Sequence, residues 1–289
     1  MDFAERIERC LRENIENNRA RSCPPGLEQA VVHAVFPGGA RIRPKICLAV
    51  AEACGEDHPR VSDAAAATIE LLHCASLVHD DLKCFDDSPL RRGRPSVHHA
   101  FGEPLAVLAG DALIVLAFES LLRVADQAPE RLPPLLEIIT QSVGMRAGII
   151  AGQAWECEQE VNLADYQQLK TGSLFAAATA AGAAAAGTDF QPWLALGQHI
   201  GSAYQVVDDI LDVAGDAEKL GKPIGQDEAR GHPSSVREMG LDGARRHFEK
   251  VMAGIVEKIP PCPGEAQLRA RIIDESSKFL PDALAEHAA

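Results

Sequence analysis

The sequence is poor in aromatic residues and in positive charge, and its cysteines form no CxxC pair. Phe, Trp and Tyr make up 4% of the 289 residues. Lys and Arg number 28 against 42 Asp and Glu, which gives a net charge of −14. A chain this acidic lacks the positive field that attracts nucleic acid or an anionic membrane, so we expect neither partner. An anionic substrate would need a local basic cluster or a bridging cation.

The cysteines and the uncharged runs favour a soluble, cytoplasmic protein. Several of the eight cysteines stand among apolar residues, as Cys47 does, which is typical of buried reduced thiols. Residues 1–18 carry charges throughout, unlike a signal peptide. The longest uncharged runs, 171–188 and 190–207, are rich in small residues or contain Pro192 and polar residues, so neither predicts a membrane span.

Helical periodicity dominates the chain, and strand signals are almost absent. Residues of type AVILMFWYC make up 46% of the sequence, enough for a large buried core. Between proline and glycine breakers, the pattern predicts helices over 4–18, 25–35, 42–55, 60–83, 104–124, 130–158, 163–169, 173–186, 190–214, 234–257 and 265–280. Because no Gly/Ser-rich or Pro-rich linker divides the sequence, we predict one all-α domain over residues 1–289.

Two aspartate clusters, each at the end of an apolar predicted helix, are the most informative features. Residues 80–87 contain four aspartates and are followed by Arg91 and Arg92, while residues 208–212 contain three. Carboxylates this close repel one another unless a cation compensates. Oxygen ligands favour Mg²⁺, which completes its coordination with water and substrate phosphates. One cluster alone could be a solvated helix end, but two clusters beside arginines predict a site for metal and diphosphate.

These motifs, in their order along the chain, resemble those of the trans-polyprenyl diphosphate synthases. The similarity is greatest to bacterial geranylgeranyl diphosphate synthases of carotenoid and photosynthetic pigment pathways, and it covers nearly the whole chain. It is carried by residues 38–44, 80–86, 90–93, 152–153, 170–172, 204–209 and 220–227. The resemblance implies an isoprenoid-synthase-type helical bundle around a deep central cavity, assembled as a homodimer.

The resemblance also implies roles for individual residues. The metal ligands for three Mg²⁺ ions would be Asp80, Asp81, Asp86, Asp208 and Asp212. The allylic diphosphate would be held by Arg91, Lys170 and Lys222, and that of isopentenyl diphosphate by Arg41, His73 and Arg92. Thr171 and Gln205 would line the reacting carbon. The residues expected to matter most for turnover are Asp80, Asp86, Asp208, Lys170 and Arg91.

The implied reaction is a prenyl transfer, the Mg²⁺-dependent head-to-tail (1′-4) condensation of isopentenyl diphosphate with allylic diphosphates of C5 to C15. Ionisation of the allylic C–O bond places negative charge on the leaving diphosphate, which metal ions and cationic side chains stabilise. The double bond of isopentenyl diphosphate attacks C1 of the allylic cation. Loss of a proton then gives a product one C5 unit longer.

Small residues before the first aspartate cluster predict a long product. Ala75 and Ser76 stand five and four residues before Asp80, where relatives that stop at C15 commonly carry an aromatic ring at the fifth position. We therefore expect C20 geranylgeranyl diphosphate as the main product, with the next obstruction near residues 113–118. The alternative is a C15 farnesyl diphosphate synthase, in which case Ala75 and Ser76 are merely close-packing residues.

The chain departs from the family pattern at Ala40, where a lysine is usual, and at His232. Lys45 could replace the lost lysine. The departures raise a rival hypothesis, a weakly active or non-catalytic partner subunit that binds prenyl diphosphate. A terpene cyclase is a third candidate, which the segment 90–93 and the second aspartate cluster disfavour. We further expect residues 155–160 to be a solvated helix end, and the pair His98-His99 to be structural.

Overall fold

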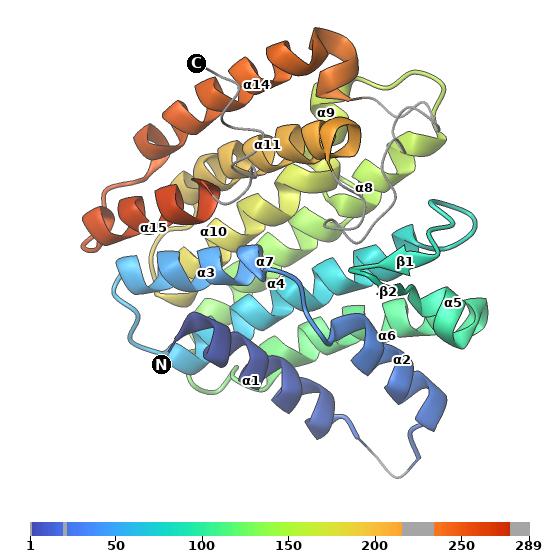
Figure 1. The fold of residues 1–289 in the computed structure, drawn as a ribbon. Helices are drawn as coiled ribbons and strands as arrows, with labels where there is room; N and C mark the ends of the chain where they lie inside the picture. The colour runs from blue at the N-terminus through green and yellow to red at the C-terminus, as the bar shows by residue number, and fades with distance from the viewer. Residues whose placement is uncertain (1, 20–21, 216–233, 278–289) are drawn as a thin grey trace.

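The computed structural model describes residues 2–19, 22–215 and 234–277, and nearly every element in this part of the chain is a helix (Figure 1). The first half contains α1 (Phe3–Asn17), α2 (Pro25–Val35), α3 (Ile42–Ala53), α4 (Pro59–Asp80), α5 (Val97–Phe101), α6 (Glu103–Leu122) and α7 (Leu132–Val143). The second half contains α8 (Ile149–Ala154), α9 (Leu163–Gln167), α10 (Ser173–Ala185), α11 (Gln191–Ala214), α14 (Ser235–Ile255) and α15 (Glu265–Ser277). The all-α prediction is confirmed.

Short turns and one small hairpin complete the described elements. Three are 3₁₀ turns, η1 (Pro129–Arg131), η2 (Trp155–Cys157) and η4 (Val256–Lys258), and η3 (Gln168–Gly172) is a π-helical turn. The strands β1 (Leu90–Arg91) and β2 (Arg94–Pro95) pair antiparallel, with Leu90 opposite Pro95 and Arg91 opposite Arg94. This hairpin and α5 were not expected from the sequence, because both are too short to show a period.

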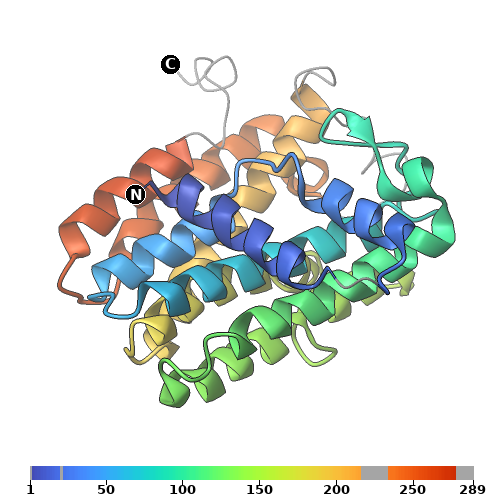
Figure 2. The ribbon, with the colours of Figure 1, turned by 90° about the horizontal axis from the view of Figure 1, so that it is seen from below.

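The alanine-rich helix α10 lies at the centre of the bundle and packs against α3, α4, α7 and α11 (Figure 1). All of its 13 residues are buried. Small side chains allow the neighbouring backbones to come close, and a Cβ on Gly182 would stand 2.3 Å from the carbonyl oxygen of Cys47 on α3. Figure 2 shows α1 and α2 lying across the other side of α4 and against α6.

By length and composition alone, α4 and α6 could each cross a membrane. For α4, 83% of the most apolar stretch is buried inside the bundle, as expected of a core helix. The corresponding stretch of α6 is only 44% buried. Its exposed apolar residues include Leu108, Val115 and Leu122, which are 51%, 57% and 60% exposed and repeat every seven residues along one side of the helix.

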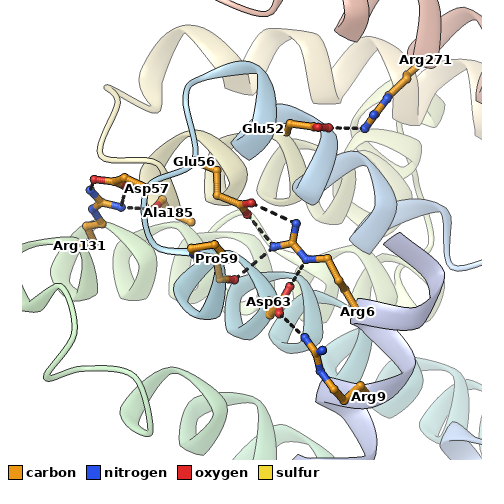
Figure 3. A network of polar contacts seen from close by, with 10 residues as sticks. All are labelled: Arg6, Arg9, Glu52, Glu56, Asp57, Pro59, Asp63, Arg131, Ala185 and Arg271. Atoms are coloured by element: carbon orange, nitrogen blue, oxygen red, sulfur yellow. Dashed lines mark hydrogen bonds and ion pairs between the residues drawn. The ribbon is translucent and has the colours of Figure 1, made fainter. Parts of the chain in front are cut away.

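Ion pairs fasten outer helices to the connection between α3 and α4 (Figure 3). Arg6 of α1 donates to Asp63 at 2.6 Å and to Glu56 at 2.7 Å, and all three side chains are largely buried. Arg131 donates to both carboxylate oxygens of Asp57, at 2.6 and 2.8 Å, and to the Ala185 carbonyl oxygen at 2.6 Å. These contacts fix the end of the bundle opposite the aspartates of α4.

The single helix predicted over residues 130–158 is wrong, because the chain breaks between α7 and α8. At Gly148 a Cβ would stand 2.4 Å from the carbonyl carbon of Ser142, so the turn requires glycine. The break separates the cavity-lining helix α8 from α7. The other predicted helices match the observed ones within a few residues over the described chain.

Candidate active site

A cavity of about 850 Å³ opens between the ends of α4, α11 and α3, the turn η3 and the loop before β1. Carboxylates from both aspartate clusters line it: Asp80, Asp86, Asp87, Asp208 and Asp212. Cationic or imidazole side chains line it as well: Arg41, Arg43, His73, His79, Arg91, Arg92 and Lys170. Apolar side chains continue the wall away from these charges, among them Leu72, Ala75, Ile114, Val143 and Ile149. A charged region adjoining an apolar one suits an anion that carries a hydrocarbon tail.

The first aspartate cluster is folded back on itself at the end of α4. The amide of Asp86 donates to the carbonyl oxygen of Asp80 at 2.8 Å, which returns Asp86 to the cavity. Burial raises the pKa of Asp80 to about 6, with Lys170 opposing and the Asp86 carboxylate adding to the rise. The two carboxylates line one cavity, and oxygen donors placed in this way fit a hard cation such as Mg²⁺.

Asp81, the second residue of that cluster, turns away from the cavity. Its buried carboxylate accepts from Arg91, with Nε 3.1 Å and Nη2 2.5 Å from Oδ1. Arg91 itself lines the cavity. The Asp81 carboxylate is therefore engaged with Arg91 and orients its guanidinium, and its role as a metal ligand stays a prediction.

The second cluster contributes through one face of α11. Residues 204, 205, 208, 211 and 212 of this helix line the cavity, as the three- and four-residue spacing requires. Asp209 lies on another face, where it accepts from the amide of Ser235 at 2.7 Å, from Gln205 Nε2 at 2.8 Å and from Gln167 Nε2 at 3.0 Å. Asp209 thus ties α9, α11 and α14 together, which leaves Asp208 and Asp212 as the ligand candidates of this cluster.

Arg41, expected to bind diphosphate, is engaged in the protein itself. Its Nε donates to Glu8 at 2.8 Å, Nη1 to Glu70 at 2.6 Å and Nη2 to the Val35 carbonyl oxygen at 2.8 Å. The Arg41 and Glu70 side chains are only 4% and 2% exposed. Arg41 lines the cavity, but each of its three side-chain nitrogens already donates a hydrogen bond within the protein, one of them to the buried Glu70.

Arg43, two residues later, is the arginine that the sequence analysis missed. Its guanidinium lies 4.3 Å from the centre of the Phe175 ring, and its buried Nε has no hydrogen-bond partner in the described chain. Nη1 lies 3.5 Å from His73 Nε2. Burial lowers the pKa of Arg43 below its ordinary value and that of His73 well below, so His73 is neutral. The signal was available, because Arg43 stands in the first turn of α3, where a helix N-terminus favours anions.

Lys170 is held by a glutamate that we expected to be solvated. Glu156 is 8% exposed and accepts from Lys170 Nζ, from the Tyr166 hydroxyl at 2.6 Å and from Gln153 Nε2 at 2.6 Å. Lys170 Nζ also lies 4.0 Å from Asp80. Burial acts to lower the pKa of Lys170, but Asp80, Tyr166 and Glu156 outweigh it, so the pKa is raised and the side chain is charged. The expected solvated helix end at 155–160 is therefore wrong for Glu156.

The remaining expected site residues are placed as follows. Thr171 donates to Gln205 at 2.5 Å, and both line the cavity, as do His73, Ala75, Ser76 and Arg92. Lys45 lies 4.0 Å from Glu275 and is not a cavity residue, so it does not replace the lysine absent at Ala40. Instead, a Cβ on Gly39 would stand 3.0 Å from Arg92 Nε, which brings that guanidinium beside Ala40. Lys222 and His232 lie outside the described residues.

Comparisons with known proteins identify the family of this chain. A polyprenyl synthetase family model matches residues 24–268. The geranylgeranyl diphosphate synthase of Cereibacter sphaeroides is 50% identical over 281 residues, 97% of this chain and 98% of that protein. The corresponding enzyme of Rhodobacter capsulatus is 52% identical over 268 residues, 93% of each chain.

The fold is also similar to that of a solved structure. The geranyltransferase of Helicobacter pylori, complexed with magnesium and isoprenyl diphosphate, superposes with a TM-score of 0.84. It is 31% identical and is matched over 96% of both chains. The chain belongs to the polyprenyl synthetase family.

Proposed function

We propose that this chain is a Mg²⁺-dependent prenyltransferase that condenses isopentenyl diphosphate with allylic diphosphates, and that its main product is geranylgeranyl diphosphate. One observation carries the proposal: carboxylates at the ends of α4 and α11 line the same cavity as Lys170, Arg91, Arg92 and Arg43. The relatives from Cereibacter sphaeroides and Rhodobacter capsulatus, at about half identity over nearly the whole chain, are named for the C20 product.

Each aspartate cluster would bind part of the metal. Asp80 and Asp86 would hold two Mg²⁺ ions, and Asp208 with Asp212 a third. When bound, Mg²⁺ supplies positive charge that stabilises the leaving diphosphate. Lys170 and Arg91 hold the allylic diphosphate, and their charges act most strongly when the C–O bond breaks. The Glu156 and Asp81 carboxylates keep these two cations in position.

The second diphosphate is held on the α3 side of the cavity. Arg43, Arg92 and neutral His73 present hydrogen-bond donors there, and Arg43 takes the place that the sequence analysis gave to Arg41. The Thr171 and Gln205 side chains, joined by their hydrogen bond, face the reacting carbon. The departing diphosphate accepts the proton that the condensed product loses.

The apolar wall determines how long the product grows. Along α4 the lining runs from Asp80 past Ser76 and Ala75 to Leu72, eight residues or about 12 Å of helix. We propose that the small Ala75 and Ser76 side chains admit the growing chain and that Leu72, Ile114 and Val143, which also line the cavity, limit its length. Ile114 belongs to the segment 113–118 that the sequence analysis expected to form the next obstruction.

The exposed face of α6 supports a homodimer. The residues Leu108, Val115 and Leu122 form an apolar row of the kind that packs against a second helix. A two-fold axis would let the same row on another copy cover it. We propose that residues 1–289 form a single synthase domain that assembles in this way as a soluble, cytoplasmic enzyme.

The test is product analysis. The protein is incubated with Mg²⁺, isopentenyl diphosphate and the C5, C10 or C15 allylic diphosphate in turn, and products are identified by mass. We expect isopentenyl diphosphate to be consumed with each starter and C20 to accumulate. Consumption of an allylic substrate without isopentenyl diphosphate would indicate a cyclase. If neither substrate is consumed, the chain is a non-catalytic subunit. The variant Asp126→Ala, which removes an exposed aspartate outside the cavity, is the matched control.

A further inference from the structure

A second group of side chains that could bind a metal ion contains two imidazoles and one carboxylate. Asp87 follows the first aspartate cluster, and His98 and His99 stand on α5, beyond the β1–β2 hairpin. One ligand atom from each of the three side chains can be chosen so that all lie within 4.8 Å of one another. From the sequence alone the two histidines are expected to be structural, since nothing in the sequence joins them to Asp87.

His98 is the residue that points to a ligand. Its side chain is 2% exposed, and its Nδ1 lies 3.0 Å from the Ser96 hydroxyl, which fixes the orientation of the ring. Its Nε2 is buried with no hydrogen-bond partner in the described chain, and it faces Asp87 Oδ1 at 3.5 Å. A buried nitrogen without a partner is unusual. A metal-binding histidine is typically oriented by a hydrogen bond at the ring nitrogen that is not on the metal, as the contact of Nδ1 with Ser96 orients His98.

The separations suit a small cation. With metal–nitrogen and metal–oxygen bonds of about 2.0–2.2 Å, neighbouring ligand atoms in a tetrahedral site stand roughly 3.3 Å apart. The 3.5 Å between His98 Nε2 and Asp87 Oδ1 is close to that value. The exposed His99 ring lies edge-on to His98, with 4.6 Å between ring centroids, and one of its nitrogens lies within 4.8 Å of a ligand atom of each of the other two residues. Water can take the fourth position.

We propose that Asp87, His98 and His99 bind a divalent cation of the zinc class at a site beside the Mg²⁺ ligands Asp80 and Asp86, with Asp87 lining the same cavity as those two residues. Imidazole ligands favour Zn²⁺ or Co²⁺ over Mg²⁺. The bound ion would link the loop after α4 to α5, on either side of the hairpin that carries Arg91. The inference does not depend on the proposed prenyl transfer.

The test is a Co²⁺ titration of the reduced, chelator-treated full chain in saturating Mg²⁺, followed by visible absorption of the metal. We expect one Co²⁺ per chain with the spectrum of a site of low coordination number, displaced by Zn²⁺. His99→Ala should weaken this binding by at least about tenfold, since loss of even an outer partner of a metal ligand costs 10–100-fold. Because His99 is exposed, the variant should keep the wild-type melting temperature.

Two further variants sharpen the comparison. Ser96→Ala leaves every ligand in place but frees the His98 ring, and should also weaken Co²⁺ binding. His199→Ala is the matched control, since His199 is a half-buried histidine of α11 that hydrogen-bonds the Ala195 carbonyl oxygen of the same helix, 2.9 Å away. The exposed thiols of Cys84 and Cys157 would give sulfur-to-cobalt charge-transfer absorption, which must be unchanged among these variants. Equal Co²⁺ binding by the wild type and His99→Ala, or no binding in Mg²⁺, would overturn the proposal and leave an ion pair between His98 and Asp87.

Discussion

Replacing Arg43 with alanine should weaken isopentenyl diphosphate binding while the fold remains intact. The buried Arg43 Nε has no hydrogen-bond partner in the described chain, so its loss removes no hydrogen bond at that atom. A hydrogen bond to a charged group is worth about 1.5–3 kcal/mol. At 1.4 kcal/mol for each factor of ten, KM for isopentenyl diphosphate should rise roughly 10- to 150-fold. The KM for the allylic substrate should change much less, because Arg91 and Lys170 remain.

Arg41→Ala, two residues away, should instead destabilise the fold. It would leave Glu70, which is 2% exposed, without the guanidinium that lies 2.6 Å away. Removing one partner of a buried ion pair costs about 3–5 kcal/mol. For a chain of this size each kcal/mol lowers the melting temperature by about 2–4 °C.

The two variants are compared by steady-state kinetics with each substrate varied in turn, and by thermal unfolding. We expect Arg43→Ala to keep its melting temperature and lose affinity, and Arg41→Ala to melt far earlier. An unchanged KM for isopentenyl diphosphate in Arg43→Ala would refute the assignment of Arg43. A large rise in that KM in an Arg41→Ala protein of normal stability would return the role to Arg41.

Three further predictions test other parts of the structure. Ala75→Phe should shift the main product from C20 to C15 without abolishing turnover, and continued C20 formation, measured by mass, would place the floor elsewhere. Cys157 and Cys84 are both exposed but only Cys157 lines the cavity, so Mg²⁺ with a diphosphate substrate should slow alkylation of Cys157 and not of Cys84 in peptide mass analysis. The hydrogen bond from Arg131 lowers the pKa of Asp57 from 3.8 to about 2. The small contribution of the Asp57–Arg131 pair to the stability of the fold should therefore be complete above about pH 4 and be lost as the pH falls toward 2. The melting temperatures of the wild type and Asp57→Asn should then coincide only in acid.

Much of the fold could be predicted because the helices carry strong periodic patterns. The alanine-rich segment became the buried helix α10, and α11 placed Asp208 and Asp212 on one face as their spacing requires. The break in the segment 130–158 could not be predicted, because it depends on how closely the backbone at Gly148 approaches Ser142.

The sequence motifs of the site could be predicted, but the partners of individual side chains could not. Asp81 belongs to the same cluster as Asp80, yet only the three-dimensional structure shows that it pairs with Arg91. The choice between Arg41 and Arg43 depends on Glu8 and Glu70, which are distant in sequence and close in space. The burial of Glu156 could not be predicted because its partners Tyr166 and Lys170 stand 10 and 14 residues later in the chain.

The central claim is that both aspartate clusters serve one metal-dependent reaction, and the most direct measurement is the turnover of isopentenyl diphosphate by Asp80→Ala and Asp208→Ala in saturating Mg²⁺. Each variant removes charge stabilisation realised mainly in the transition state, so we predict a loss of at least about 10²-fold in kcat, with Asp126→Ala unchanged. Circular dichroism would confirm that the variants fold. Near-normal turnover by either folded variant would contradict the account.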